Sequence, residues 1–101
     1  MQLHPLKLVT IVTEAVLKDQ IGKKIVELGA TGYTCQEASG FGSRGARRTP
    51  AGGENVRIEI VCPAGPAEAI LTYVSHSFFE NYACIAWVAD ISVVRGAYYA
   101  K

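Results

Sequence analysis

The sequence lacks the features that mark membrane, secreted and metal-binding proteins. No apolar run reaches the roughly 20 residues that a membrane-spanning helix needs. The N-terminal residues MQLHPLK lead straight into a strand-like run without a signal-peptide cleavage pattern. The three cysteines, Cys35, Cys62 and Cys84, are odd in number and widely spaced, which fits neither a disulfide framework nor a zinc site. We therefore expect a cytoplasmic protein with reduced core cysteines and no direct membrane insertion.

Net charge and recognisable catalytic groups are also scarce. The formal net charge is only +1, which argues against a dedicated nucleic-acid-binding protein, and the aromatic strand motif of RNA-recognition domains is absent. His4 and His76 are too far apart to suggest a pair of metal ligands, and Ser43 has no evident histidine partner for a nucleophilic triad. We predict no catalytic residues, no metal site and no prosthetic group, and hence a protein that is not an enzyme.

The most distinctive stretch that is present is the loop from Gly40 to Gly53, GFGSRGARRTPAGG. It holds five of the ten glycines and three of the five arginines, and it has no acidic residue. Glycine allows backbone N–H groups to wrap an anion, and the planar guanidinium of arginine matches phosphate. We predict that this loop, at least at its Gly40 base, binds the phosphates of a nucleotide. A solvated basic loop without a ligand is the alternative.

Residues Gly40 to Gly45 also match the pattern G-x-G-x-x-G, but not in its usual context. A dinucleotide-binding fingerprint follows the first strand and opens a helix. This stretch follows the second predicted strand and runs into Pro50 and a further pair of glycines. We therefore interpret it as a set of flexible N–H groups beside arginines and not as a dinucleotide site.

Hydrophobic periodicity predicts four strands and two helices. Alternating or β-branched runs indicate the strands, and apolar residues three or four positions apart indicate the helices. Thr13 is expected to cap the first helix and Gly29 to end it. The predicted elements are a strand at Leu6 to Val12, a helix from about residue 14 to 28, strands at Tyr33 to Ala38 and Asn55 to Cys62, a helix from Gly65 to near residue 80, and a strand at Ala83 to Val94.

This order of elements predicts one ferredoxin-like α+β domain over the 101 residues. Two strand–helix–strand units with right-handed crossovers give a four-stranded antiparallel sheet with both helices on one face, in the order βαββαβ. A bare apolar face usually meets a partner, so we expect a homo-oligomer whose sheets pack together. The apolar residues that we expect to compete for both faces are Val9, Ile11, Val61, Ala86, Val88 and Val94.

Four stretches of the chain resemble the PII-like signalling proteins. They are KLVTIV (Lys7 to Val12), GATGYT (Gly29 to Thr34), GFGSR (Gly40 to Arg44) and VRIEIVCP (Val56 to Pro63). The residues Gly42, Ser43, Arg44 and Arg47, with FFENYACIAW (Phe78 to Trp87), resemble the branch tied to bicarbonate transport and to carboxysome gene clusters. Transporter-associated members often end in a cysteine hairpin, and this chain ends without one, so the carboxysome-associated member is the favoured match. The resemblance implies a single PII-like domain over residues 1–101, with an effector loop at about residues 40–54.

The resemblance also implies a homotrimer with three nucleotide sites in the clefts between subunits. Members of this branch respond to adenine nucleotides such as ADP, AMP, cAMP or ATP and to inorganic carbon, so bicarbonate is an expected second ligand. The loop would report to a protein partner, a bicarbonate transporter or another protein of carbon metabolism. Slow adenine-nucleotide hydrolysis is the alternative function, and an RNA-binding module is less favoured.

Matching the motifs by position implies a set of nucleotide-binding residues with distinct roles. Backbone at the loop base would line the site, two arginines would hold phosphate, a group on three strands would wall the adenosine, and the start of the last strand would close the cleft from the neighbouring subunit. In that order the residues are Gly40, Phe41, Gly42 and Ser43; Arg44 and Arg47; Val12, Thr31, Gly32, Thr34, Glu59 and Val61; and Ala83, Cys84 and Ile85, with Arg95 as an additional candidate.

Overall fold

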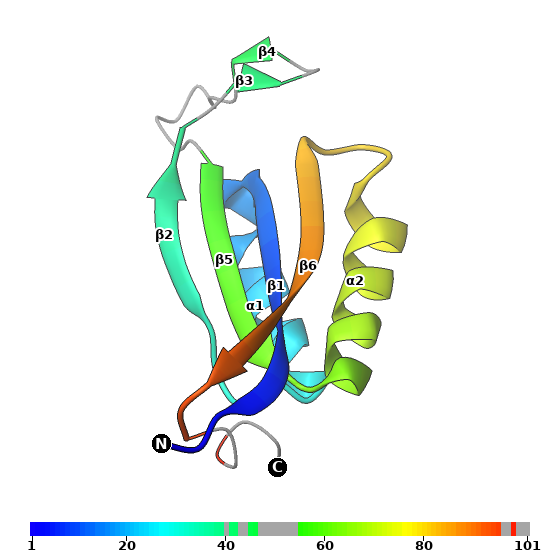
Figure 1. The fold of residues 1–101 in the computed structure, drawn as a ribbon. Coiled ribbons are helices and arrows are strands. Elements are labelled where there is room, and N and C mark those ends of the chain that lie inside the picture. The colour runs from blue at the N-terminus through cyan, green and yellow to red at the C-terminus, as the bar shows by residue number, and fades with distance from the viewer. Residues whose placement is uncertain (40, 43–44, 47–54, 96–97, 99–101) are drawn as a thin grey trace.

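The chain folds into a four-stranded antiparallel sheet that is covered on one face by two helices (Figure 1). The computed structural model describes residues 1–39, 41–42, 45–46, 55–95 and 98. The sheet order is β2-β5-β1-β6, which confirms the ferredoxin-like arrangement. The elements are β1 (His4–Glu14), the 3-10 turn η1 (Ala15–Leu17), α1 (Lys18–Glu27), β2 (Thr34–Ala38), β3 (Phe41–Gly42), β4 (Gly45–Ala46), β5 (Asn55–Cys62), α2 (Ala64–Phe78) and β6 (Cys84–Val93).

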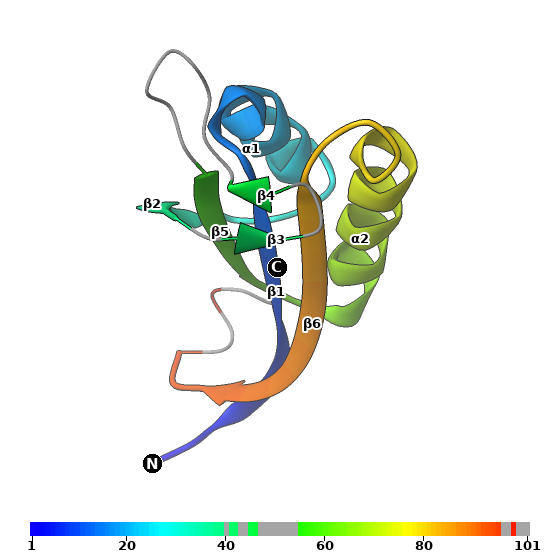
Figure 2. The ribbon, with the colours of Figure 1, turned by 90° about the horizontal axis from the view of Figure 1, so that it is seen from above.

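The core lies between the sheet and the helix layer, and Figure 2 shows α1 and α2 on the same side of the sheet. Residues directly opposite each other in an antiparallel pair share a face. Ile11 pairs with Ile58 on β5 and with Ala86 on β6. Ile11 and Ile58 are both fully buried among the helix side chains. This register places the alternating residues that start at Val56 in the core, as predicted.

The predicted composition of the open sheet face was partly wrong. Val9 and Ile11 are fully buried on the helix side, and the register places Ala86 and Val88 on that side as well. The reason is the strict alternation of a strand: once Ile11 faces the helices, the even-numbered residues of β1 face the other way. Among β5, β1 and β6, the residues that the register places on the open face include Leu8, Thr10, Val12, Arg57, Glu59, Val61, Ile85, Trp87 and Ala89.

The first helix begins differently from the prediction. Thr13 was expected to cap it, but β1 continues to Glu14 and a 3-10 turn precedes α1. The Thr13 hydroxyl donates instead to the carbonyl oxygen of Ala83 at 3.1 Å. Pairing with β5 and β6 extends β1 past the capping position, so tertiary hydrogen bonds replace the local cap. The apolar face of the helix is as predicted, with Ile21 and Ile25 fully buried.

Gly29 ends α1 in a left-handed conformation with φ of 113°. The N–H of Ala30 donates to the carbonyl of Ile25, and that of Gly29 donates to Val26, both at 3.1 Å. This pair of bonds satisfies carbonyls that the last helical turn would otherwise leave unpaired, and it requires a residue that tolerates positive φ.

Gly29→Ala is therefore expected to lower the free energy of unfolding by about 1–2 kcal/mol, the cost of a left-handed L-residue. An added Cβ would also lie 3.1 Å from Cγ of Pro66. Gly65→Ala is the matched control, because a Cβ there has no neighbour within 4 Å and Gly65 lies within helix α2. Urea denaturation at fixed protein concentration compares the two, and an unchanged midpoint for Gly29→Ala would contradict the cap.

The segment predicted as a loop contains a short ladder in its described part. β3 and β4 pair antiparallel, with Phe41 opposite Ala46 and Gly42 opposite Gly45. The remaining residues of the segment, 40, 43–44 and 47–54, lie outside the described residues. The prediction of a loop did not include this ladder, because two-residue strands leave no periodicity to detect.

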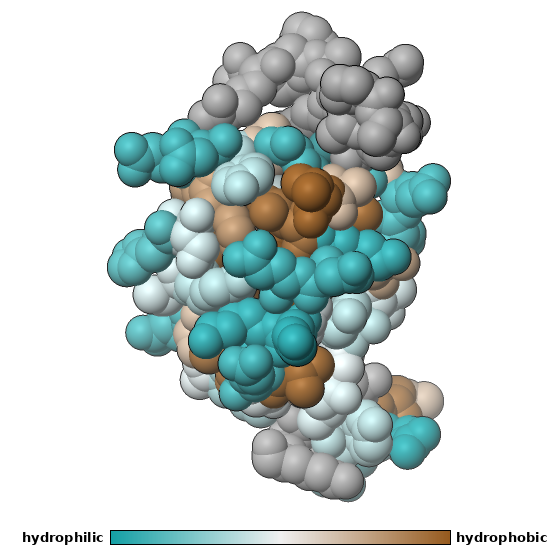
Figure 3. Space-filling view, turned by 180° about the vertical axis from the view of Figure 1, so that it is seen from behind, coloured by the Kyte–Doolittle hydropathy of each residue, from teal (hydrophilic) through white to brown (hydrophobic). Residues whose placement is uncertain are grey.

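The outer surface and the cysteines agree with a water-exposed fold. Hydrophilic side chains cover most of the helix side, with separate hydrophobic areas between them (Figure 3). None of the three cysteines forms a disulfide, and only Cys62 is fully buried. Burial raises the pKa of the Cys62 thiol, which therefore packs as a neutral core group. Within the described residues, no helix has the length and apolar character to cross a membrane.

Candidate functional site

A pocket with a volume of about 240 Å³ lies on the open face where β2 meets β5. The segment before β2 and its first residue contribute one wall, and alternate residues of β5 contribute the other. Thr34 stands directly opposite Glu59 in the register, which brings the two walls together. The lining residues are Thr31, Gly32, Tyr33, Thr34, Glu59, Val61 and Tyr98.

Five of the six residues predicted to wall the adenosine line this pocket. Thr31, Gly32 and Thr34 are 25 or more residues away from Glu59 and Val61 in the sequence, yet they meet here. Val12 does not line the pocket. Val12 lies on the same open face but on β1, where it stands opposite Arg57 of β5 and Ile85 of β6.

The pocket combines aromatic, apolar and hydrogen-bonding groups. Tyrosine rings and Val61 offer flat and apolar surface, while threonine hydroxyls donate and accept hydrogen bonds and a carboxylate accepts them. Gly32 leaves open space where a side chain would stand, since an added Cβ has no neighbour within 4 Å. A flat heterocycle with polar edges fits this mixture of groups.

Two tyrosines of the pocket were missed by the sequence analysis. Tyr33 lies against α1 at Gly22, where an added Cβ would stand only 2.3 Å from the tyrosine hydroxyl. A glycine in the middle of a helix was the available signal for this close approach. Tyr98 follows Arg95, which has a φ of 64°, and its N–H donates to the carbonyl oxygen of Arg95 at 3.1 Å. No pattern in the sequence indicated that Tyr98 returns to the sheet.

Arg95 lies beside this end of the site but does not line it. Its guanidinium is 5.5 Å from the centroid of the Tyr98 ring, a distance typical of a cation–π contact. The structure therefore places Arg95 beside a pocket residue and two residues after β6, which ends at Val93. That end of β6 is far from β3 and β4 (Figure 1).

The third predicted group, Ala83 to Ile85, lies at the opposite edge of the sheet. β2 and β6 are the two edge strands, so within one chain this group lies two strand spacings of about 4.8 Å each from the β5 wall of the pocket and three from its β2 wall. The register also places Cys84 opposite Thr13, at the end of the sheet where β2 finishes. One chain cannot bring Ala83 to Ile85 to its own pocket, and a site that contains both groups needs a second copy.

The start of β6 is held firmly by the end of β1. The N–H of Ala83 donates to Oε2 of Glu14 at 2.8 Å. The hydroxyl of Thr13, which is fully buried, donates to the carbonyl oxygen of Ala83 at 3.1 Å. Both backbone polar groups of Ala83, its N–H and its carbonyl oxygen, thus bond to side chains that are distant in sequence. This arrangement sets the position of the segment that was predicted to close the cleft.

Glu14→Ala is expected to lower the free energy of unfolding by about 1 kcal/mol, because it leaves the largely buried Ala83 N–H without its acceptor. Glu14→Gln keeps an acceptor oxygen and should lose less than half of that. Amide hydrogen exchange at Ala83 gives a local readout. Equal protection in wild type and Glu14→Ala would show that the carboxylate does not hold this segment.

The predicted loop-base and phosphate-binding residues are only partly described. Phe41 and Gly42 form β3, at the end of the sheet where β2 finishes (Figure 1). Gly40, Ser43, Arg44 and Arg47 lie outside the described residues, so their predicted roles remain predictions.

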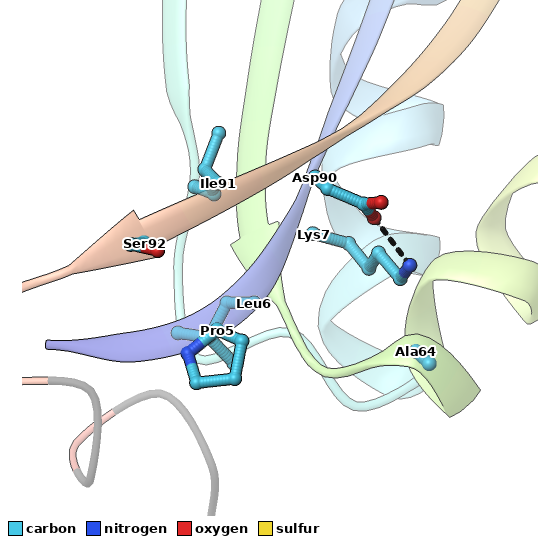
Figure 4. A pocket seen from close by; sticks show the side chains of 7 residues that line it. All are labelled: Pro5, Leu6, Lys7, Ala64, Asp90, Ile91 and Ser92. Atoms are coloured by element: carbon cyan, nitrogen blue, oxygen red, sulfur yellow. Dashed lines mark hydrogen bonds and ion pairs between the residues drawn. The ribbon is translucent and has the colours of Figure 1, made fainter.

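A second, larger cavity of about 450 Å³ lies between the ends of β1, β6 and α2 (Figure 4). Lys7 and Asp90 point toward each other there and form an ion pair. The cavity contains none of the predicted nucleotide-binding residues, and its one lysine already has a carboxylate partner. Within the described part of the chain, no group of three or more histidine, cysteine or acidic residues could hold a metal ion.

Comparison with known proteins shows what this chain is similar to. The family described as "Nitrogen regulatory protein P-II" matches residues 6–98. A PII-like signalling protein from Thermus thermophilus is 39% identical, with a TM-score of 0.85 over 99% of this chain and 100% of that one. The CPII protein of Thiomonas intermedia, in a structure bound to ADP and bicarbonate, is 28% identical, with a TM-score of 0.84 over 95% of each chain.

A further structure of CPII, bound to ADP, AMP and bicarbonate, is 27% identical and has a TM-score of 0.80 over 93% of this chain and all of that one. The structural match therefore covers nearly the whole chain, as the family match does. Because the family match covers nearly the whole sequence and the fold agrees with it, the chain belongs to the nitrogen regulatory P-II family.

Proposed function

We propose that this protein is a cytoplasmic sensor that binds an adenine nucleotide, ADP or AMP, together with bicarbonate. The sites lie in clefts between the subunits of a homotrimer. The protein acts without catalysis and regulates inorganic-carbon uptake or fixation by presenting the segment of residues 40–54 to a protein partner. CPII, which shares this fold, has been observed with ADP, AMP and bicarbonate, and this supports the choice of ligands.

The observation that carries the proposal is the position of the pocket relative to that segment. The pocket lies at the start of β2, and the segment follows its end. Thr34 and Ala38 are four steps apart, about 13 Å along a strand. A nucleoside in the pocket could extend its phosphates along the β2 edge toward Gly40, Arg44 and Arg47, which are the residues predicted to hold them.

The edges of the sheet support a ring of identical subunits. The pocket belongs to the β2 edge, and Ala83 to Ile85 belong to the β6 edge. A contact that joins the β2 edge of one copy to the β6 edge of the next is heterologous, and such contacts form a ring when the rotation between copies closes. Exposed Ile85 and Trp87 on the open face provide apolar surface for the same assembly.

Signalling requires that the ligand favour one state of the protein over another. The backbone N–H and carbonyl oxygen of Ala83 are held by Glu14 and Thr13, and a nucleotide placed between that segment and the neighbouring β2 edge would contact both. Binding would then be read out at the segment that follows β2, which contains the arginines that are predicted to hold the phosphates.

Isothermal titration calorimetry of the purified protein tests the proposal. AMP and ADP should bind, GMP should bind more weakly, and bicarbonate should change the affinity for the nucleotide.

Light scattering should give the mass of a trimer. Prolonged incubation of the protein with ATP should leave the ATP intact, whereas released product would favour the slow hydrolase. A monomer that binds no adenine nucleotide would refute the proposal.

A further inference from the structure

Arg57 connects the pocket to the far edge of the sheet. Its Nε and Nη2 lie 3.3 and 3.2 Å from Oε2 of Glu59, and its guanidinium lies 5.6 Å from the centroid of the Trp87 ring. β1 lies between β5 and β6, so the contact between Arg57 and Trp87 passes over β1 on the open face of the sheet. Thr10 of β1 pairs with both Glu59 and Trp87 in the register and is fully buried. The guanidinium is therefore held between a carboxylate and an aromatic ring.

The geometry leaves one oxygen of Glu59 for a ligand. Both contacts from Arg57 go to Oε2, and Oε1 has no partner among the described residues. The Glu59 side chain is 36% exposed and lines the pocket. A carboxylate beside a guanidinium accepts hydrogen bonds and does not donate them, so a ligand group that meets Oε1 must be a donor.

We propose that Arg57, backed by Trp87, is a positioning residue that directs Oε1 of Glu59 into the pocket to accept a hydrogen bond from the nucleoside part of the ligand. This inference rests on the proposed function and names the groups that make the pocket selective. The donor is a ribose hydroxyl or the exocyclic amino group of the base, since both present an N–H or O–H to an acceptor. Without Arg57 the Glu59 side chain is free to take other rotamers, and the selectivity falls.

Analogues of AMP that lack one donor each provide the test. The affinities of AMP, 2′-deoxy-AMP, 3′-deoxy-AMP and purine riboside 5′-monophosphate are measured by calorimetry. In the wild-type protein, one analogue should bind about tenfold more weakly than AMP, the effect of one hydrogen bond to a charged, partly exposed acceptor. The analogue that loses affinity identifies the donor.

Arg57→Met removes the guanidinium but keeps an unbranched apolar stem over the sheet. In this variant the difference between AMP and the weakened analogue should shrink to within about twofold, because AMP loses affinity and the analogue does not. Trp87→Phe should keep the difference, since a ring remains under the guanidinium, and Trp87→Ala should reduce it. Lys7→Met is the matched control: it breaks the ion pair with Asp90 at the larger cavity and should leave the selectivity unchanged.

The outcomes separate this inference from the proposed function. If the wild-type protein binds AMP and every analogue with equal affinity, the inference is overturned and the proposed function stays intact. The same holds if the difference in affinity between AMP and the weakened analogue is undiminished in both Arg57→Met and Trp87→Ala. Equal losses for AMP and every analogue in Arg57→Met would show a structural role only, and would also overturn it. Failure of the wild-type protein to bind AMP at all overturns both.

Discussion

Ile21→Ala is expected to lower the free energy of unfolding by about 3 kcal/mol, within the range for removing a large aliphatic side chain from a packed core. Ile21 is fully buried and belongs to the same hydrophobic core cluster as Ile11 and Ile58. A loss of this size should lower the melting temperature by roughly 10–25 °C in a domain of this length. Urea denaturation monitored by circular dichroism measures the free energy directly.

Val26→Ala is the matched control for Ile21→Ala. Both residues are β-branched and lie in α1, but Val26 is 54% exposed, so its truncation should change the free energy by less than about 0.5 kcal/mol. Protein concentration must be the same in all samples, because an assembly makes apparent stability depend on concentration. Similar losses for the two variants would mean that the cluster around Ile21 is not the core of the fold.

Arg47→Ala is expected to weaken the binding of ADP or AMP by about ten- to a hundredfold, the scale of a charge-assisted hydrogen bond to phosphate. Arg47 lies in the glycine- and arginine-rich segment that follows β2, and its predicted role is to hold phosphate. The effect should appear in calorimetry with ADP and AMP and should be small with adenosine, which has no phosphate.

Arg48→Ala removes the same charge from the neighbouring position and serves as the control. Arg48 is not among the residues predicted to contact the nucleotide, so its loss should change affinity by less than about threefold, the size of a screened, indirect charge effect. If both variants bind ADP as tightly as wild type, or if both lose affinity to the same extent, then the segment acts through its overall charge and Arg47 has no specific contact.

The alternation of apolar residues in β5 shows what a local sequence pattern can predict. Asn55 to Cys62 was predicted as a strand, and the structure confirms it residue for residue. The run is bounded by Pro63, and its even-numbered residues from Val56 to Cys62 are all apolar, so one face has to be buried wherever the strand is placed. The strand at Ala83 to Val94 was one residue too long at each end, because alternation does not mark where pairing with β1 stops.

The candidate site shows what a local sequence pattern cannot predict. Thr31, Gly32, Thr34, Glu59 and Val61 were identified through resemblance to the PII-like proteins, and the fold brings all five to one pocket. Tyr33 and Tyr98 were missed, because their positions depend on a close approach to Gly22 and on the backbone turn at Arg95. Thr13 was assigned to a helix cap, because the sequence does not show that its hydroxyl reaches Ala83, 70 residues away.

The sequence by itself determined the order of strands and helices, the βαββαβ topology and the apolar face of each helix, because these depend on periodicities of a few residues. Only the tertiary structure decided which side of β1 faces the helices, which residues share the β2–β5 edge, and that Ala83 to Ile85 stand at the opposite edge. The physical reason is that strand pairing and sheet order join residues far apart in the chain. A shift of one residue in register would exchange every core side chain for a surface one, so these choices depend on the packing of the whole domain.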